Sequence, residues 1–229
     1  MRYLSKCTRR QGRCFVEAIH VCNTEVLIEK SEHYLQINDI NPSLIKDIWE
    51  ALADEYPGFE LWLCFHNNTP PEDVIRTIGA EILDDCVDLR LLSNDFNADN
   101  IHRNVSRLEL DDFEGFAAMY DKLPDMNWTS RRIRETWNIW CIFVMRGCKK
   151  IIGYTLMMIS ENHEYGEIFA LEALSTNQKK ALLAAACAEA FEIGKNSVIY
   201  MADTLDQQEL AKGLGFHVSG YYKGYRVIL

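Results

Sequence analysis

The chain has 229 residues, of which 48% are hydrophobic, and a formal net charge of −10 at neutral pH. This length fits one large domain or two small ones, and the apolar share is sufficient for a buried core. The acidic charge, without any dense run of Lys or Arg, argues against nucleic acid as a partner. It is compatible with a cationic partner such as an amine, although many proteins without such a partner are equally acidic.

The eight cysteines are scattered along the chain and form no Cys-x-x-Cys pair, which argues against a zinc site or any other metal site. The first residues lack the apolar core of a secretory signal. No run approaches the roughly 18 apolar residues of a membrane span. We therefore expect a reduced, cytoplasmic protein with no membrane partner.

The first part of the chain predicts several strands interrupted by two helices. The first helix is expected to begin around Pro42, because proline is favoured in the first helical turn, and to end at Pro57–Gly58. The second is short and stops at Gly79. The expected strands are 1–7, 14–22, 26–28, 34–37, 61–65 and 81–92.

Residues 93–106 are rich in Asn, Asp and Ser and are predicted to form a linker. A second set of elements follows this linker. The expected helices begin near 111, 128, 175 and 203. The expected strands are 108–110, 140–145, 150–159, 167–174 and 198–202, with one or two more in 217–229.

The two parts of the chain share a pattern of glycines and apolar residues. The pairs Gly58/Gly194 and Gly79/Gly215 have the same offset of 136 residues (194 − 58 and 215 − 79). With that offset Val74 aligns with Leu210 without a gap. Exact identities are few, so a chance match between two strand–helix–strand segments remains an alternative. The favoured interpretation is a tandem of two related α/β units.

Residues 167–229 run in the order strand, helix, strand, helix, strand, and Leu210–Phe216 (LAKGLGF) precedes the closing strands. This order and this phrase resemble the GNAT superfamily of acyl-CoA-dependent N-acyltransferases, and residues 180–194 are similar to that family's cofactor helix. The resemblance implies an α/β (α+β) fold of two GNAT-like units with mixed central sheets flanked by helices. The units would be 1–92, which is truncated, and 107–229.

The resemblance implies acetyl-CoA as co-substrate, bound at the N-terminus of the helix that begins near residue 175. Free backbone N–H groups and the helix dipole attract phosphate there. The family's glycines are missing from this segment, so an ordinary capped helix is the alternative. The predicted cofactor-binding residues are Leu174, Asn177, Gln178, Lys179, Lys180 and Thr204.

A general base must accept a proton from the acceptor ammonium, and a partly buried glutamate suits this role. Glu172 and Glu167 lie on the central strand, and their spacing predicts that they point to opposite faces. The position of the family's tyrosine acid holds Ala211, so the candidate substitutes are Tyr221, Tyr222 and Tyr225, of which Tyr222 is the predicted one. The alternatives are solvated carboxylates for the glutamates and aromatic strand packing for Tyr222.

The acceptor pocket of this family lies near the segment that holds Trp128, Trp137 and Asp125 here. Aromatic rings and a carboxylate can receive an amine by cation–π and charge contacts. Core packing of two amphipathic helices is the alternative for the two tryptophans. The predicted substrate is a small-molecule amine or a peptide amine.

The leading hypothesis is an N-acetyltransferase that moves an acetyl group from acetyl-CoA to a small amine or amino-terminal acceptor. The second is a non-catalytic GNAT-like binding or scaffold protein, and a homodimer is an open alternative. An unrelated α/β fold is the third. A V-shaped gap between strands 167–174 and 198–202 is the feature that favours cofactor binding.

Overall fold

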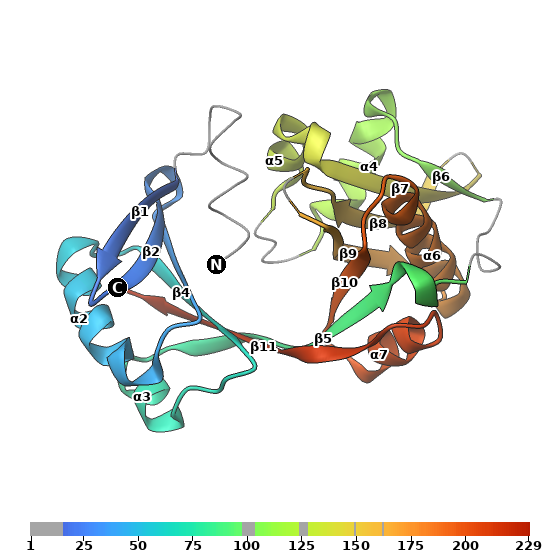
Figure 1. Cartoon of the computed structure of the whole chain (residues 1–229). Coiled ribbons are helices and arrows are strands. Elements are labelled where there is room, and N and C mark those ends of the chain that lie inside the picture. The colour runs from blue at the N-terminus through green and yellow to red at the C-terminus, as the bar shows by residue number, and fades with distance from the viewer. Residues whose placement is uncertain (1–15, 98–103, 124–127, 149, 162) are drawn as a thin grey trace. The chain divides into compact units, whose positions relative to one another are not determined.

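A computed structural model describes residues 16–97, 104–123, 128–148, 150–161 and 163–229 (Figure 1). The chain divides into two compact units: unit 1 comprises residues 1–87 and 220–229, and unit 2 comprises residues 88–219. Within the described residues, no helix has the length and apolarity needed to cross a bilayer. The strand expected at 1–7 lies outside the described residues.

Unit 1 is a mixed sheet with strand order β1-β2-β3-β4-β11-β5. Strands β1, β2 and β3 are antiparallel neighbours, β3 and β4 are parallel, and β4 pairs antiparallel with β11. The elements are β1 (Val16–Val21), β2 (Thr24–Glu29), β3 (Tyr34–Asn38), α2 (Ile45–Glu55), β4 (Glu60–His66), α3 (Glu72–Thr77) and β5 (Glu81–Leu92).

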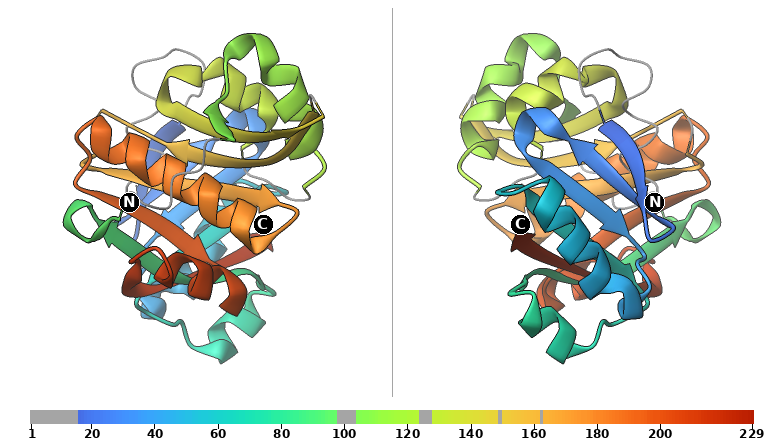
Figure 2. Two further views of the ribbon diagram at one scale, coloured as in Figure 1. Left: turned by 90° about the vertical axis from the view of Figure 1, so that its right-hand side faces the viewer. Right: turned by 90° about the vertical axis from the view of Figure 1, so that its left-hand side faces the viewer.

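Helix α2 lies across the sheet of unit 1 (Figure 2, right). It buries Ile45, Ile48 and Leu52, which recur at helical spacing and so share one face. They join a core that includes Leu63 and Phe65 of β4. Successive side chains of a strand point to opposite faces, so the residues of β4 that lie between these apolar ones face the other side of the sheet.

Unit 2 is a mixed sheet with strand order β11-β5-β10-β9-β8-β7-β6. Helix α6 crosses this sheet diagonally in Figure 2, left. The elements are β6 (Val105–Arg107), α4 (Phe113–Tyr120), α5 (Ser130–Glu135), β7 (Trp140–Gly147), β8 (Lys150–Met158), β9 (Tyr165–Ala173), α6 (Thr176–Glu192), β10 (Ser197–Ala202), α7 (Leu205–Lys212) and β11 (His217–Ile228).

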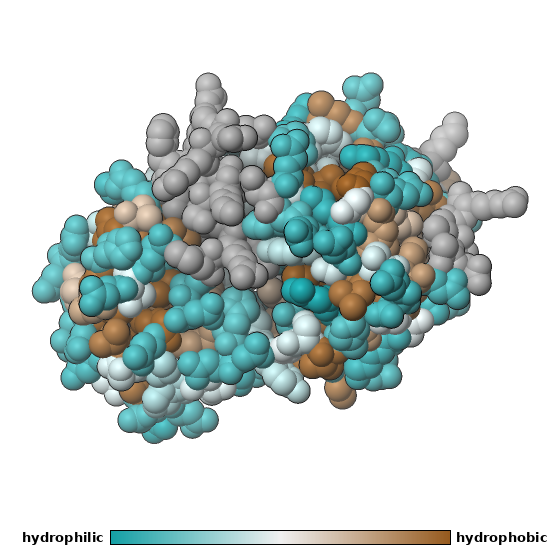
Figure 3. Space-filling view, viewed as in Figure 1, coloured by the Kyte–Doolittle hydropathy of each residue, from teal (hydrophilic) through white to brown (hydrophobic). Residues whose placement is uncertain are grey.

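Helix α6 is buried over most of its middle, where residues 181–187 are all buried. Four of these seven are alanines, whose small side chains allow close approach of the helix to its neighbours. In the space-filling view of Figure 3, hydrophobic residues lie in small groups separated by hydrophilic ones. The described part of the face shown there presents no continuous apolar surface.

Two strands contribute to both units. Strand β5 lies in unit 1 up to Val87 and in unit 2 from Asp88, and β11 lies in unit 2 up to Ser219 and in unit 1 from Gly220. The bounds of the two strands differ by the same 136 residues as the glycine pairs (217 − 81 and 228 − 92). Each unit therefore includes a strand from the other part of the sequence.

The mixed α/β class with helices flanking the sheets is confirmed. The compact units do not follow the sequence boundaries at 92 and 107, because residues 88–106 lie in unit 2 and 220–229 in unit 1. The predicted linker ends in β6, and residues 108–110, expected as a strand, lead into the 3-10 turn Leu110–Asp112. The origin of the units as a tandem stays a prediction.

Candidate functional site

Strands β9 and β10 of unit 2 pair only over part of their length. Their parallel ladder runs from Tyr165↔Ser197 to Ile168↔Tyr200. Strand β9 continues to Ala173, still paired on its other side with β8, and β10 continues to Ala202. Beyond the last pair, β9 therefore has an edge of backbone N–H and C=O groups that β10 does not use.

A β-bulge in β9 coincides with the end of this ladder. On the β8 side, the register passes from Ala170↔Leu156 to Ile168↔Met157, which leaves Phe169 as an extra residue. A bulge bends its strand and increases the local twist. Phe169 directly follows Ile168, the last residue of β9 that pairs with β10, so the bulge accounts for the parting of the two strands.

Unit 1 also contains a parallel pair of strands, β3 and β4, and these two strands stay together. Strand β3 pairs with β4 through Asn38↔Cys64. The next residue, Asp39, continues the contact: its N–H donates to the Cys64 carbonyl at 2.8 Å, and its Oδ1 accepts from the His66 N–H at 3.1 Å. The parting of parallel strands is therefore a property of unit 2.

The N-terminus of α6 follows directly after the unpaired end of β9. A capping box closes it: Ser175 Oγ accepts from the Gln178 N–H, and Gln178 Oε1 accepts from the Ser175 N–H at 3.1 Å. The predicted cofactor residue Gln178 is thus already engaged. The N–H groups of Thr176 and Asn177 have no acceptor among the described residues, so they are the donors available for an anion.

Two cations follow these donors in the first turns of the helix. Lys179 lies 3.8 Å from Glu172, measured from Nζ to Oε2, so the structure brings together two of the predicted site residues. Lys180 is half-buried and forms no ion pair with any described residue. An anion at the helix N-terminus would compete with Glu172 for Lys179.

Large apolar side chains are exposed shortly after β9 and β10, at Leu174 and at Leu205, the first residue of α7. Leu174 is 82% exposed and Leu205 is 75% exposed. Thr204, a predicted cofactor contact, is the N-cap of α7, and its hydroxyl accepts from the Gln207 N–H at 3.3 Å. Exposed leucines at the carboxyl ends of two parallel strands favour a ligand with an apolar section at that edge.

Glu167 and Glu172 lie on the same face of the sheet, not on opposite faces as their spacing predicted. Glu172 is opposite Tyr154, and Glu167 is opposite Met158. Residues directly opposite each other share a face, and so do residues four apart on the regular part of β8. The extra residue Phe169 reverses the alternation between the two glutamates. Glu167 is 4% exposed, whereas the Glu172 side chain is 45% exposed.

Aromatic side chains pack on this face. Phe116 of α4 contacts Tyr154 with a centroid distance of 5.1 Å, and Trp140 of β7 contacts Phe169 at 5.3 Å. We call the set that surrounds the face the aromatic wall. Its members are Phe116, Tyr120, Trp128, Trp140, Tyr154 and Phe169.

The predicted acceptor residues have different surroundings. Trp128 is half-buried, meets Trp140 edge-on at 5.0 Å, and carries the Arg132 guanidinium 5.7 Å above its ring. Trp137 packs edge-on against Phe113 at 5.7 Å, and Phe113 in turn contacts Phe116 of the aromatic wall at 5.6 Å. Asp125 lies outside the described residues.

Tyr222, the predicted general acid, lies in unit 1, whereas Glu172 lies in unit 2. Its hydroxyl donates to Cys64 Sγ at 3.2 Å, and its ring lies 5.1 Å from that of His66. Burial, with the neighbouring Cys64, raises the pKa of Tyr222. The structure gives no support to a shared role of Tyr222 and Glu172.

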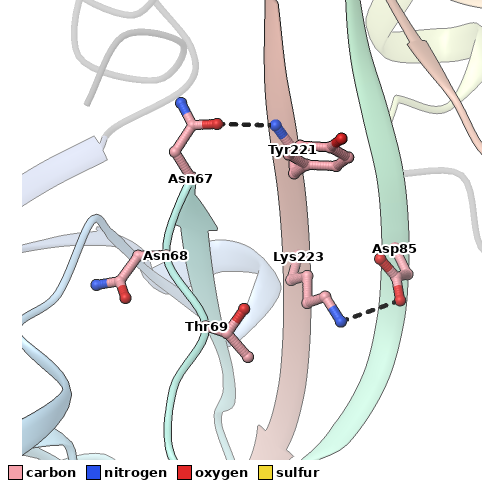
Figure 4. Close-up of a pocket in the computed structure, with 6 residues that line it drawn as sticks. All are labelled: Asn67, Asn68, Thr69, Asp85, Tyr221 and Lys223. Atoms are coloured by element: carbon pink, nitrogen blue, oxygen red, sulfur yellow. Dashed lines mark hydrogen bonds and ion pairs between the residues drawn. The ribbon is translucent and has the colours of Figure 1, made fainter. Parts of the chain in front are cut away.

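Unit 1 also carries a hollow of about 340 Å³, shown in Figure 4. Its charged groups pair with each other, because Lys223 Nζ lies 3.1 Å from Asp85 Oδ2. Asn67 Oδ1 accepts from the Tyr221 N–H at 2.9 Å. In the described part of the chain no cluster of His, Cys, Asp and Glu is arranged to hold a metal ion.

These features define a GNAT-like fold: a mixed sheet in which two parallel strands part beside the N-terminus of the central helix. No protein-family model matches the sequence, and no curated protein matches it. Solved structures do match the fold. A conserved protein of unknown function from Staphylococcus epidermidis superposes with a TM-score of 0.65 at 13% identity, with 99% of each chain covered.

Two acetyltransferase-related structures match as well. A GCN5-related N-acetyltransferase from Kribbella flavida has a TM-score of 0.62 at 13% identity, covering 93% of this chain and 89% of the other. A tandem GNAT protein of the clavulanic acid biosynthesis pathway has a TM-score of 0.56 at 9% identity, covering 89% and 78%. At such identities the likeness establishes the fold alone.

Proposed function

We propose that this protein is an acyl-CoA-dependent N-acyltransferase, and specifically one that moves an acetyl group from acetyl-CoA to a small amine or amino-terminal acceptor. The observation that carries the proposal is the end of the β9–β10 ladder at Ile168↔Tyr200. It lies beside the α6 N-terminus, where the N–H groups of Thr176 and Asn177 have no described acceptor.

The two parts of acyl-CoA have matching partners there. The pyrophosphate binds the free N–H groups at the start of α6, with Lys179 and Lys180 as counter-charges. The pantetheine amides pair with the free edge of residues 169–173, as an added strand would. Exposed Leu174 and Leu205 pack against its apolar sections.

The acceptor ammonium first gives one proton to the carboxylate of Glu172, which is more accessible than Glu167. The freed amine nitrogen then attacks the thioester carbonyl carbon, the carbon–sulfur bond breaks, and CoA leaves as a thiolate. The second proton leaves the nitrogen as the amide forms and passes to the thiolate or to water. A free thiol has a pKa of roughly 8.5, so a thiolate is a tolerable leaving group at neutral pH. Ala211 in place of a tyrosine acid is therefore compatible with turnover.

A second candidate is a GNAT-like protein that binds CoA without catalysis. It is favoured by the ion pair between Lys179 and Glu172, which neutralises the proposed base. The missing glycines of the α6 loop favour it too. This candidate predicts binding of CoA and acetyl-CoA with equal affinity and no release of thiol.

The test is a melting titration with acetyl-CoA, followed by thiol release across a panel of small amines and peptides. A thermal shift that saturates, together with amine-dependent release of CoA, supports the transferase. Saturable stabilisation without release supports the binding protein, and no shift at millimolar acetyl-CoA refutes both. A cytoplasmic location is also proposed, and it is supported by six cysteines that are free thiols in the described residues.

A further inference from the structure

Two tyrosine hydroxyls in the aromatic wall are buried without hydrogen bonds. Tyr120 and Tyr154 are each 1% exposed, and neither hydroxyl has a partner among the described residues. Buried polar groups are nearly always paired, because an unpaired one loses its hydration without compensation. The unpaired hydroxyls of Tyr120 and Tyr154 lie in one cluster, which indicates that they have a functional role offsetting the free-energy cost of their burial.

The two rings are fixed by their surroundings. Tyr120 of α4 and Tyr154 of β8 meet with a centroid distance of 6.0 Å, and Phe116 contacts both, at 5.2 and 5.1 Å. Tyr154 stands directly opposite Glu172 on the neighbouring strand. Opposite residues on one face have Cβ atoms about 4.5–5.5 Å apart, so the two side chains are neighbours, although the Tyr154 hydroxyl makes no hydrogen bond to the carboxylate in this structure.

Both phenols remain protonated at neutral pH. Burial raises the pKa of Tyr154, and the negative charge of Glu172 raises it further. Burial also raises the pKa of Tyr120, with smaller contributions from Tyr154 and Asp121. A neutral phenol next to a carboxylate can act as a hydrogen-bond donor to it.

In the structure, Glu172 is instead associated with Lys179, at 3.8 Å. Lys179 belongs to the first turn of α6, where the proposed function places the cofactor's pyrophosphate. A pyrophosphate carries more negative charge than a carboxylate and is a stronger partner for an ammonium group. Its binding would draw Lys179 away and leave Glu172 without its counter-ion.

Resting on the proposed transferase function, we propose that Tyr154 is a positioning residue that receives the Glu172 carboxylate once the cofactor has displaced Lys179. The Tyr154 hydroxyl then donates to the carboxylate and holds it for the acceptor ammonium, while Tyr120 packs behind the Tyr154 ring. Tyr154 keeps its own proton throughout, and the amine proton goes to Glu172. Acetyl-CoA consequently binds before the amine.

The charged and titratable groups around Glu172 are few in the described residues. Lys179 approaches it from α6, Tyr154 from β8, and Tyr120 of α4 packs behind Tyr154. Glu167 lies on the same face of β9, in the paired part of the strand. A donor to a carboxylate favours its charged form. Loss of the Tyr154 hydroxyl should therefore shift the pH dependence of turnover in the cofactor-bound protein to higher pH.

The test compares Tyr154→Phe with the wild type and with Tyr56→Phe, a half-buried control in unit 1. We expect Tyr154→Phe to lower kcat about 10-fold, to move the acid limb of kcat/KM for the amine, measured at saturating acetyl-CoA, to higher pH, and to leave the Kd for acetyl-CoA unchanged. The variant should melt about 2–4 °C higher, because an unpaired buried hydroxyl is removed. Higher stability with unchanged kcat and pH profile would overturn the inference.

A second readout does not depend on turnover. The Glu172 carboxylate can be observed by carbon-13 NMR in the full chain, with and without CoA. A carboxylate resonance that Tyr154→Phe shifts only when CoA is bound supports the inference, and equal resonances in the two CoA-bound proteins contradict it. If this Tyr154-dependent shift appears but the wild type shows no turnover, the proposed function fails while the hydroxyl contact stands.

Discussion

Replacing Thr176 by proline separates the structural role of the α6 N-terminus from its proposed role in binding. Thr176 is the first helical residue, and its N–H has no acceptor in the described structure. Proline lacks only this N–H and is favoured at that position. The preceding residue, Ser175, has φ −141° and ψ 156°, the extended conformation that precedes proline.

Thr176→Pro should affect protein stability and acyl-CoA binding in opposite directions. Stability should be unchanged or rise by about 0.4–1 kcal/mol, because proline restricts the unfolded chain. Binding of acyl-CoA should weaken, because one hydrogen bond to a charged group contributes about 1.5–3 kcal/mol. At about 1.4 kcal/mol per factor of ten, this loss is a rise of roughly 10- to 100-fold in Kd.

Calorimetric titration with acetyl-CoA measures the Kd, and a melting curve measures stability. Thr176→Ala is the matched control, since it removes the same side chain and keeps the N–H, and its Kd should stay within a few-fold of the wild type. An unchanged Kd in a folded Thr176→Pro protein would show that this N–H does not bind the cofactor.

Three further predictions concern the base, the sheet and the exchanged strand. Glu172→Gln should lower kcat by about 10²- to 10⁴-fold with little change in the Kd for acetyl-CoA, and steady-state kinetics with undiminished kcat would exclude Glu172 as base. Gly153→Ala should lower the melting temperature by about 2–12 °C, because a Cβ there would lie 2.8 Å from the Ala173 Cβ; an unaltered melting curve would contradict this packing. A fragment of residues 107–229 should show no cooperative melt by circular dichroism, because it lacks residues 88–92 of the unit 2 sheet. A fragment that melts like the full chain would show that the fold of unit 2 does not depend on residues 88–92.

Features with local signals were predictable from the sequence. Strand β5 has the predicted bounds, and α6 begins at the predicted cap, because Ser175 and Gln178 form a capping box that can be read from four consecutive residues. The exchange of β5 and β11 between units was not predicted, since strand order depends on contacts between distant segments.

The site was predicted only in part, for a similar reason. The pairing of Lys179 with Glu172 follows from the order of strand and helix, which the sequence indicates. The common face of Glu167 and Glu172 depends on the bulge at Phe169, and a bulge is defined by the partner strand. A role for Tyr154 was not predicted, because a tyrosine inside an apolar run looks like an ordinary core residue in the sequence. Only the structure shows that its hydroxyl is buried without a partner among the described residues.

The most direct test of the account is a crystal structure of the full chain with CoA bound. The account predicts the pantetheine arm along residues 169–173, on the side that β10 leaves open, and the pyrophosphate on the N–H groups of Thr176 and Asn177. CoA bound elsewhere on the chain, or side chains filling the space beyond Ile168↔Tyr200 while CoA fails to bind, would contradict it.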